Sequence, residues 1–188
     1  MAPVRRGGRA TTIGGDQLLW SEAEGARGTR WRESLVRDGV LVRSLLLEVS
    51  AAGRPTRLEV TAPAGLLTLH PEPDESALHG NVVGADGIRH LAFPWSGEYE
   101  LLIFDSPASA TITLRKLAGS LVVGATRVLD VLRIDDDLDP RLARWNVERI
   151  ARHAWHLRDR DGTDERRLTV DEDARPLLTN AVTWPLET

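Results

Sequence analysis

A repeated exchange between short strand-like segments and turn signals constrains the fold more than any other feature of this sequence. Most segments alternate polar and apolar residues, which is the pattern of a strand with one buried face. Glycine, proline and Asp-Gly breaks separate them at intervals of roughly 8–12 residues, a spacing typical of antiparallel sheets. We assign strands to Gln17–Trp20, Thr29–Arg37, Val40–Val49, Thr56–Thr61, Leu66–His70, Val82–Val83, Ile88–Phe93, Tyr99–Phe104, Leu121–Val123, Arg127–Ile134, Val147–His156, Arg166–Val170 and Leu177–Trp184.

One segment, Ser106–Gly119, fits two structures. Its ends favour a helix, because Ser106 suits the N-cap, Pro107 the first helical position and Gly119 the C-terminal end. Its middle alternates apolar and polar residues and is rich in β-branched side chains, which favours a strand. The residues alone leave both structures open.

Composition narrows the function classes. The chain has 188 residues with 41% hydrophobic content, enough to bury about 70% of its unfolded surface in one core. A net charge of −4 disfavours a general nucleic-acid binder, and the absence of cysteine excludes disulfides, thiolate metal sites and thiol nucleophiles. We expect a flexible tail over residues 1–16, a single β-rich domain over residues 17–188, a cytoplasmic location and no integral membrane association.

Candidate metal and nucleotide sites fail on spacing. The spacing of Asp135, Asp137 and Asp139 matches the first three ligand positions of a calcium-binding loop. The positions that need glycine and glutamate hold Pro140 and Asn146 instead. We interpret them as a solvated acidic turn. His153 and His156 would point to opposite faces of a strand, and Gly119–Gly124 lacks the lysine of a phosphate-binding loop. We therefore expect no metal, no cofactor and, without a recognisable nucleophile motif, no enzyme.

The segment Ser106–Leu117, SPASATITLRKL, is similar to a motif of the family described as glycolipid-binding, a domain of unknown function. The family motif reads Ser/Thr-Pro and then Thr-Asn-Thr-Leu-Pro-Ile-Arg-Arg-Leu. Ala110 stands where the family has Asn, and Thr113 where it has Pro. The positions that match directly are Ser106, Pro107, Thr111, Arg115 and Leu117.

Weaker matches follow in the same order from about residue 17 to about residue 187. They are Leu18–Trp20, Asp38-Gly39, Gly53–Val60, Arg127–Pro140, Leu168–Asp173 and Thr183–Pro185. The resemblance implies a spiral β-roll, in which one long curved antiparallel sheet wraps around a single helix, often as a homodimer. It thereby favours the helix for Ser106–Gly119, and it implies binding of a glycolipid or another amphiphile.

A carrier of amphiphiles needs an apolar concave face that its own helix fills only in part, with polar groups at the rim for the head group. Arg115 and Lys116 are our candidates for that head group, and Thr111 shares their motif. Alternatively, both cations neutralise the helix end and pair with Asp105 or other nearby acids. An aromatic edge that stacks on a sugar is proposed at Trp95, Tyr99 and Trp145.

The six tryptophans are otherwise expected to be core or rim residues of the β domain. Two other functions stay open. A protein-interaction or homodimerisation module would use edge strands and exposed tryptophan. A hydrolase of unrecognised type would need His153 or His156 beside a serine or an aspartate in a cleft.

Overall fold

The computed structural model describes residues 4–12, 15–72, 74, 76–96, 98–103, 106–178 and 182–183. These residues form one helix and a single fifteen-stranded sheet. The elements of the first half are β1 (Val4–Thr12), β2 (Gln17–Gly25), β3 (Gly28–Arg37), β4 (Val40–Ser50), β5 (Pro55–Ala62), β6 (Gly65–Pro71), β7 (Ala77–Gly84) and β8 (Gly87–Pro94). The second half contains β9 (Glu100–Ile103), α1 (Pro107–Ala118), β10 (Thr126–Ile134), β11 (Arg141–Ala151), β12 (Ala154–Asp159), β13 (Glu165–Val170), β14 (Pro176–Leu178) and β15 (Val182–Thr183).

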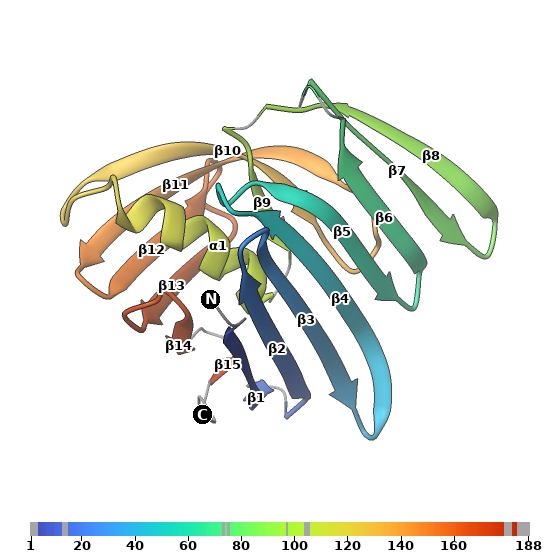
Figure 1. The fold of residues 1–188 in the computed structure, drawn as a ribbon, viewed down its shortest axis with the longest axis horizontal. Helices are drawn as coiled ribbons and strands as arrows, with labels where there is room; N and C mark the ends of the chain where they lie inside the picture. Colours follow the sequence, from blue (N-terminus) through green and yellow to red (C-terminus); the bar gives the residue numbers. More distant parts are fainter. Residues whose placement is uncertain are drawn as a thin grey trace.

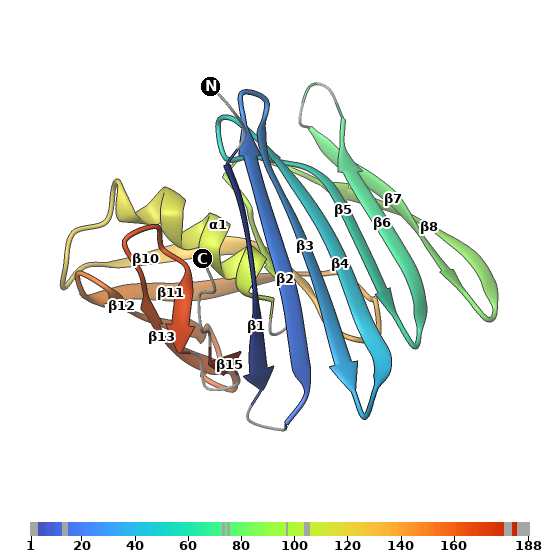
Figure 2. The same ribbon diagram turned by 60° about the horizontal axis from the view of Figure 1, so that its bottom comes forward.

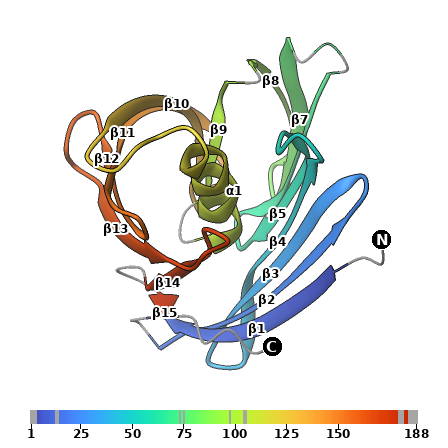
Figure 3. The same ribbon diagram turned by 60° about the vertical axis from the view of Figure 1, so that its left-hand side comes forward.

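The sheet runs in the order β8-β7-β6-β5-β4-β3-β2-β1-β15-β14-β13-β12-β11-β10-β9. Strands β1–β8 form a long curved meander, and β10–β13 curl into a half-barrel that faces it (Figure 1). Seen from the side, α1 lies between the half-barrel and the meander (Figure 3). The expected mainly β roll around one helix is therefore confirmed.

Turn chemistry fixes the hairpins of the meander. At the β3–β4 turn Asp38 and Gly39 have φ values of 50° and 78°, which is the conformation that an Asp-Gly pair tolerates in a two-residue hairpin. Gly80 in β7 has a different reason: a Cβ there would lie 1.8 Å from the carbonyl oxygen of Thr68 on β6. Glycine at this position lets the two strands approach closely.

The helix predicted at Ser106–Gly119 is confirmed. The Ser106 side chain caps it by accepting from the Ser109 amide, and Pro107 occupies the first turn. One face, with Ala108 and Ile112, joins the core of the meander, while Leu114 and Leu117 join the core of the half-barrel. Because sheet surrounds the helix on both sides, its apolar residues are not confined to one stripe, and this explains its strand-like sequence pattern.

Strand β9 lies at one edge of the sheet, yet all four of its residues are buried. Leu101 and Ile103 face the core of the meander, and Leu102 faces that of the half-barrel. It pairs in parallel with β10, and α1 forms the connection between them. The meander and the half-barrel cover the side chains on the two faces of β9, and the Ser109 hydroxyl of α1 accepts from the Ile103 amide at 3.3 Å.

A network of charged side chains joins the two halves at the start of the sheet. The buried Glu22 on β2 accepts from Arg175 Nη2 at 2.7 Å and from Arg115 Nη2 at 3.1 Å. Arg175 lies in the turn between β13 and β14, where it also pairs with Asp173, and Arg6 of β1 reaches Asp173 at 2.9 Å. The network ties the first two strands to α1 and to the last part of the half-barrel.

Three sequence interpretations are corrected. Residues 4–12 are not a tail but form β1, which pairs with β2 over its whole length. Gly8 lies under the Trp20 indole, where a Cβ would meet Nε1 at 2.7 Å. This strand contacts its neighbour through backbone and small residues, so it carries no apolar alternation.

The other two corrections concern turns. Leu121–Val123 belongs to the turn after α1, and Val147–His156 spans a hairpin whose turn is at Arg152 and His153. Because that turn contains neither glycine nor proline, no turn signal marks it in the sequence. Phe104 and Trp184, the ends of two predicted strands, lie outside the described residues.

The network at Glu22 supports a stability prediction. Glu22→Ala leaves the buried Arg175 guanidinium without its carboxylate, so the free energy of unfolding should fall by about 3–5 kcal/mol in urea titrations. The matched control is Glu172→Ala, which breaks the pair between Arg152 and Glu172, both about three-quarters exposed; the expected loss there is below about 1 kcal/mol. Equal losses in the two variants would contradict the role of the network.

Candidate functional site

Three buried glutamates surround α1. Glu33 of β3 contacts its N-terminus, while Glu22 of β2 and Glu100 of β9 contact its last turns. Burial of a carboxylate is unfavourable unless polar groups satisfy it. Each of these carboxylates therefore serves as a fixed polar anchor for the helix.

Glu33 is the most perturbed of the three. Its Oε1 accepts from the Ala108 backbone amide at 2.7 Å, where a helix N-terminus favours negative charge. Burial nevertheless raises the pKa of Glu33 to about 7, against the opposing effects of the Ala108 amide, the Ser106 hydroxyl and the Arg43 guanidinium. The helix start therefore contains an acid that titrates near neutral pH.

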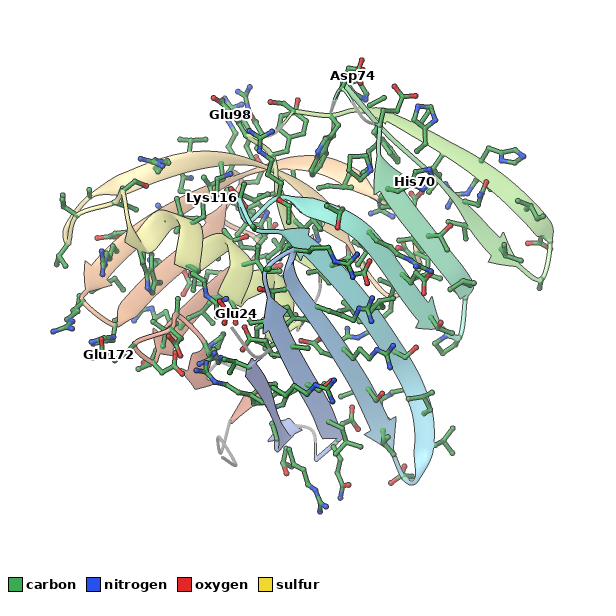
Figure 4. All side chains as sticks on the ribbon, viewed as in Figure 1. Glu24, His70, Asp74, Glu98, Lys116 and Glu172 are labelled. Carbon is green, nitrogen blue, oxygen red and sulfur yellow. The ribbon has the colours of Figure 1, made fainter. Side chains whose placement is uncertain are left out.

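The two proposed head-group cations, Arg115 and Lys116, bind these carboxylates. Arg115 donates to Glu22 and to the Asp173 carbonyl oxygen at 3.2 Å. Lys116, in the last turn of α1 and labelled in Figure 4, places its Nζ 2.6 Å from Glu100 Oε1. Burial raises the pKa of Glu100, and Lys116 opposes that shift. These contacts agree with the alternative interpretation, in which the two cations pair with nearby acids. Asp105, the acid named in that interpretation, lies outside the described residues.

The remaining predicted residues are divided between core and surface. Thr111 is fully buried, and its hydroxyl donates to the Pro107 carbonyl oxygen at 2.8 Å. Trp95 is buried, with Tyr99 edge-on to it at a centroid distance of 5.5 Å. Of the two rings, the half-buried Tyr99 is the one with access to solvent.

Trp145 of β11 is 1% exposed and packs in the half-barrel core. With α1 and β9 it encloses a small apolar cavity of about 10 Å³, lined by Leu101, Leu102, Ala110, Thr113, Leu129, Val131, Trp145, Val147 and Leu157. A space of this size is roughly that of one water molecule. The side chains around the helix are therefore closely packed at this point.

Trp145 also borders an open depression of about 490 Å³ on the other side. Its lining mixes charged residues, among them Arg133, Arg160 and Asp161, with apolar or amphipathic ones such as Tyr99 and Leu142. Trp145 thus lines both a depression open to solvent and the apolar cavity beside α1. Of the six predicted site residues, Tyr99 and Trp145 both line this depression. Arg115 and Lys116 do not line it; they form the ion pairs with Glu22 and Glu100.

The histidines and aspartates considered for metal binding or catalysis lie next to oppositely charged side chains or, for the histidines, next to glutamates. His153 faces Glu172 at 3.4 Å and His156 faces Glu165 at 3.3 Å, both glutamates rather than hydroxyl nucleophiles. Asp137 and Asp139 pair with Arg141, as expected of an acidic turn. Within the described part of the chain, no group of three or more histidine or acidic residues is arranged to hold a metal ion.

Sequence reasoning missed the three glutamates. Glu22 follows Leu18 and Trp20 at alternate positions of one strand, and Glu33 follows Trp31 in the same way. A glutamate at the same alternate positions as tryptophans expected in the core could have predicted a buried carboxylate. Glu100 carries no such signal, because all of β9 is buried.

These features define a class of fold, a curved sheet and half-barrel around one anchored helix, and the comparisons support it. A solved structure of a DUF1089 family protein from Pseudomonas aeruginosa is similar, with a TM-score of 0.56 and 18% identity, and the match covers 95% of this chain and 89% of that one. At this identity the likeness shows the fold alone. Searches against family models and curated proteins found no match, so the resemblance to the glycolipid-binding family stays a prediction.

Glu33 makes stability depend on pH. Because its pKa is raised in the folded state, the folded protein holds this proton between about pH 4.5 and about pH 7, whereas the unfolded chain loses it. Stability therefore falls as the pH rises through that window, by about 3 kcal/mol in total. Glu33→Gln keeps an acceptor for the Ala108 amide and does not ionise, so it should be the more stable protein at about pH 8.

Urea titrations between about pH 5 and about pH 8 measure this difference. The exposed Glu24→Gln on β2 is the control and should follow the wild-type profile. If the Glu33→Gln variant kept the full pH slope of the wild type, the titration of Glu33 would not be its source.

Proposed function

We propose that this protein binds an amphiphile, with a glycolipid as the class that the sequence resemblance implies, and that it does so without catalysis. Support comes from one observation: Trp145 lines both the open depression, which contains charged residues, and the apolar cavity beside α1. A ligand with a polar head and an apolar chain would match these two neighbouring spaces, with the head in the open depression and the chain in the apolar cavity.

In this proposal the chain of the ligand enters between α1 and the half-barrel, and Trp145 moves aside to admit it. The cavity of about 10 Å³ is far below the roughly 300–1,000 Å³ of typical ligand sites, so binding requires such a rearrangement. Each buried CH₂ of the chain would contribute about 0.8 kcal/mol toward it.

The head group would lie in the depression, with Tyr99 as a stacking surface and Arg160 as a polar contact. Arg133 also lines the depression but already binds Asp135 at 3.0 Å. Arg115 and Lys116 are less suited, because a ligand would first have to displace the carboxylates of Glu22 and Glu100. A cytoplasmic location stays a prediction. The described residues include no helix long and apolar enough to cross a membrane.

Filling the cavity tests the proposal. Ala110→Leu adds side-chain volume where the space is about 10 Å³, so it should weaken binding of the fluorescent fatty acid cis-parinaric acid by about tenfold or more. Ala92→Leu, at an exposed position of β8, is the control and should bind as the wild type does. Native mass spectrometry of the purified protein should also detect a bound lipid. A wild-type protein with neither lipid nor fatty-acid binding would refute the proposal.

A second candidate is homodimerisation through β8. This edge strand presents Ile88, which forms an exposed apolar row with its cross-strand neighbours Val83 and Leu66. Edge strands offer unpaired backbone groups to a second chain, and a row of apolar side chains across three strands would be buried with them. The row lies in the half of the meander that is far from α1 (Figure 2).

Light scattering tests this candidate. If the wild type is a dimer, Ile88→Asp should give a monomer, because a desolvated carboxylate would face its counterpart across the contact. Val40→Asp is the control, since Val40 is equally exposed but lies at the β3–β4 turn. A wild type that is monomeric at all concentrations would exclude the candidate.

A further inference from the structure

Three apolar side chains are exposed together at the end of the half-barrel. Val122 and Val123, in the turn after α1, are 71% and 54% exposed, and Ile150 near the end of β11 is 47% exposed. The Gly124 amide donates to the Arg149 carbonyl oxygen at 2.8 Å, which places the two segments side by side. We call Val122, Val123 and Ile150 the apolar tip.

The structure holds the apolar tip in this exposed position. Arg149 Nη1 donates to the carbonyl oxygens of Ala118 at 3.1 Å and Leu121 at 2.8 Å, and its guanidinium lies 5.1 Å from the centre of the Trp155 ring. Leu121 is buried in the half-barrel core. The turn is therefore anchored immediately before the two valines, and their exposure is a property of the fold.

Two arginines lie close to the apolar tip, and neither makes an ion pair among the described residues. Arg127 donates to the Ser120 hydroxyl at 3.2 Å and contacts no acid among the described side chains. Arg149 binds carbonyl oxygens only. The acids of this region have other partners: Glu172 pairs with Arg152, and Glu148 faces His156. Two arginines thus accompany the apolar side chains without a carboxylate of their own.

The position suits contact with a flat surface. The turn between α1 and β10 forms one end of the longest axis of the molecule, in both Figure 1 and Figure 2. No other described element extends beyond it on that side. A planar partner can therefore reach the valines without displacing any strand.

We propose that the apolar tip docks on the surface of a bilayer that contains anionic lipids. Valine and isoleucine side chains gain by entering the interface between head groups and acyl chains, while the flanking Arg127 keeps its charge among the phosphates. The inference rests on the proposed amphiphile binding, because a bilayer is the source of such ligands. It adds the place at which the ligand would pass between the bilayer and the protein, at the end of the same helix that borders the cavity.

Sedimentation with vesicles tests the proposal. The wild type should bind phosphatidylcholine vesicles that contain about 30% phosphatidylglycerol, and binding should weaken in about 0.5 M salt. The double variant with Val122→Asp and Val123→Asp should lose at least about tenfold in vesicle affinity. Arg127→Glu should lose about fivefold or more. Val40→Asp, an exposed apolar position at a distant turn, should bind as the wild type does.

The outcomes separate this proposal from the preceding one. If the wild type binds cis-parinaric acid but neither anionic nor neutral vesicles, the docking proposal is overturned and the amphiphile proposal stands. If vesicles bind and the fatty acid does not, the apolar tip is supported as a docking surface and the amphiphile proposal fails. Vesicle affinity that is equal in the wild type, the double variant and Arg127→Glu would also overturn the docking proposal.

Discussion

The helix α1 is buried between the two halves of one sheet, and both hydrophobic cores are built against it. A helix enclosed on both sides must satisfy its polar groups internally, and here three buried glutamates from three strands do so. Glu33 meets the amide of Ala108 at the helix start, and Glu22 and Glu100 meet Arg115 and Lys116 near its end. Each carboxylate loses its hydration for this purpose, which raises the pKa of Glu33 to about 7.

The same arrangement gives the molecule two distinct interiors. The core of the meander is continuous with the outer face of β9 and the end of β10, whereas the core of the half-barrel contains Trp145 and Trp155. Trp145 of the half-barrel core also lines an open depression at the surface. The proposed binding of an amphiphile and the proposed bilayer contact therefore belong to the same half of the molecule, along one helix.

Much of the fold was predictable, and the misses have physical causes. Alternation and Asp-Gly turns predicted the strands of the meander, and capping residues predicted both ends of α1. Strand β1 was not predicted, because its arginine, glycine and alanine residues show no apolar alternation, although residues 4–11 pair with β2. The β11–β12 turn escaped because Arg152 and His153 carry no turn signal. The predicted burial of tryptophan is confirmed for Trp20, Trp31, Trp95, Trp145 and Trp155, while Trp184 lies outside the described residues.

Alternation, turn residues and composition predicted a mainly β fold and excluded the chemistries that need cysteine, whereas capping residues marked Ser106–Gly119 as a possible helix without excluding a strand. These are local properties, since periodicity, turn residues and composition act over a few neighbours. Only the tertiary structure decided that Arg115 and Lys116 bind carboxylates, that Tyr99 and Trp145 border one depression, and that Val122, Val123 and Ile150 share one exposed end. Those relations join residues far apart in the chain, and the curvature of the sheet sets them.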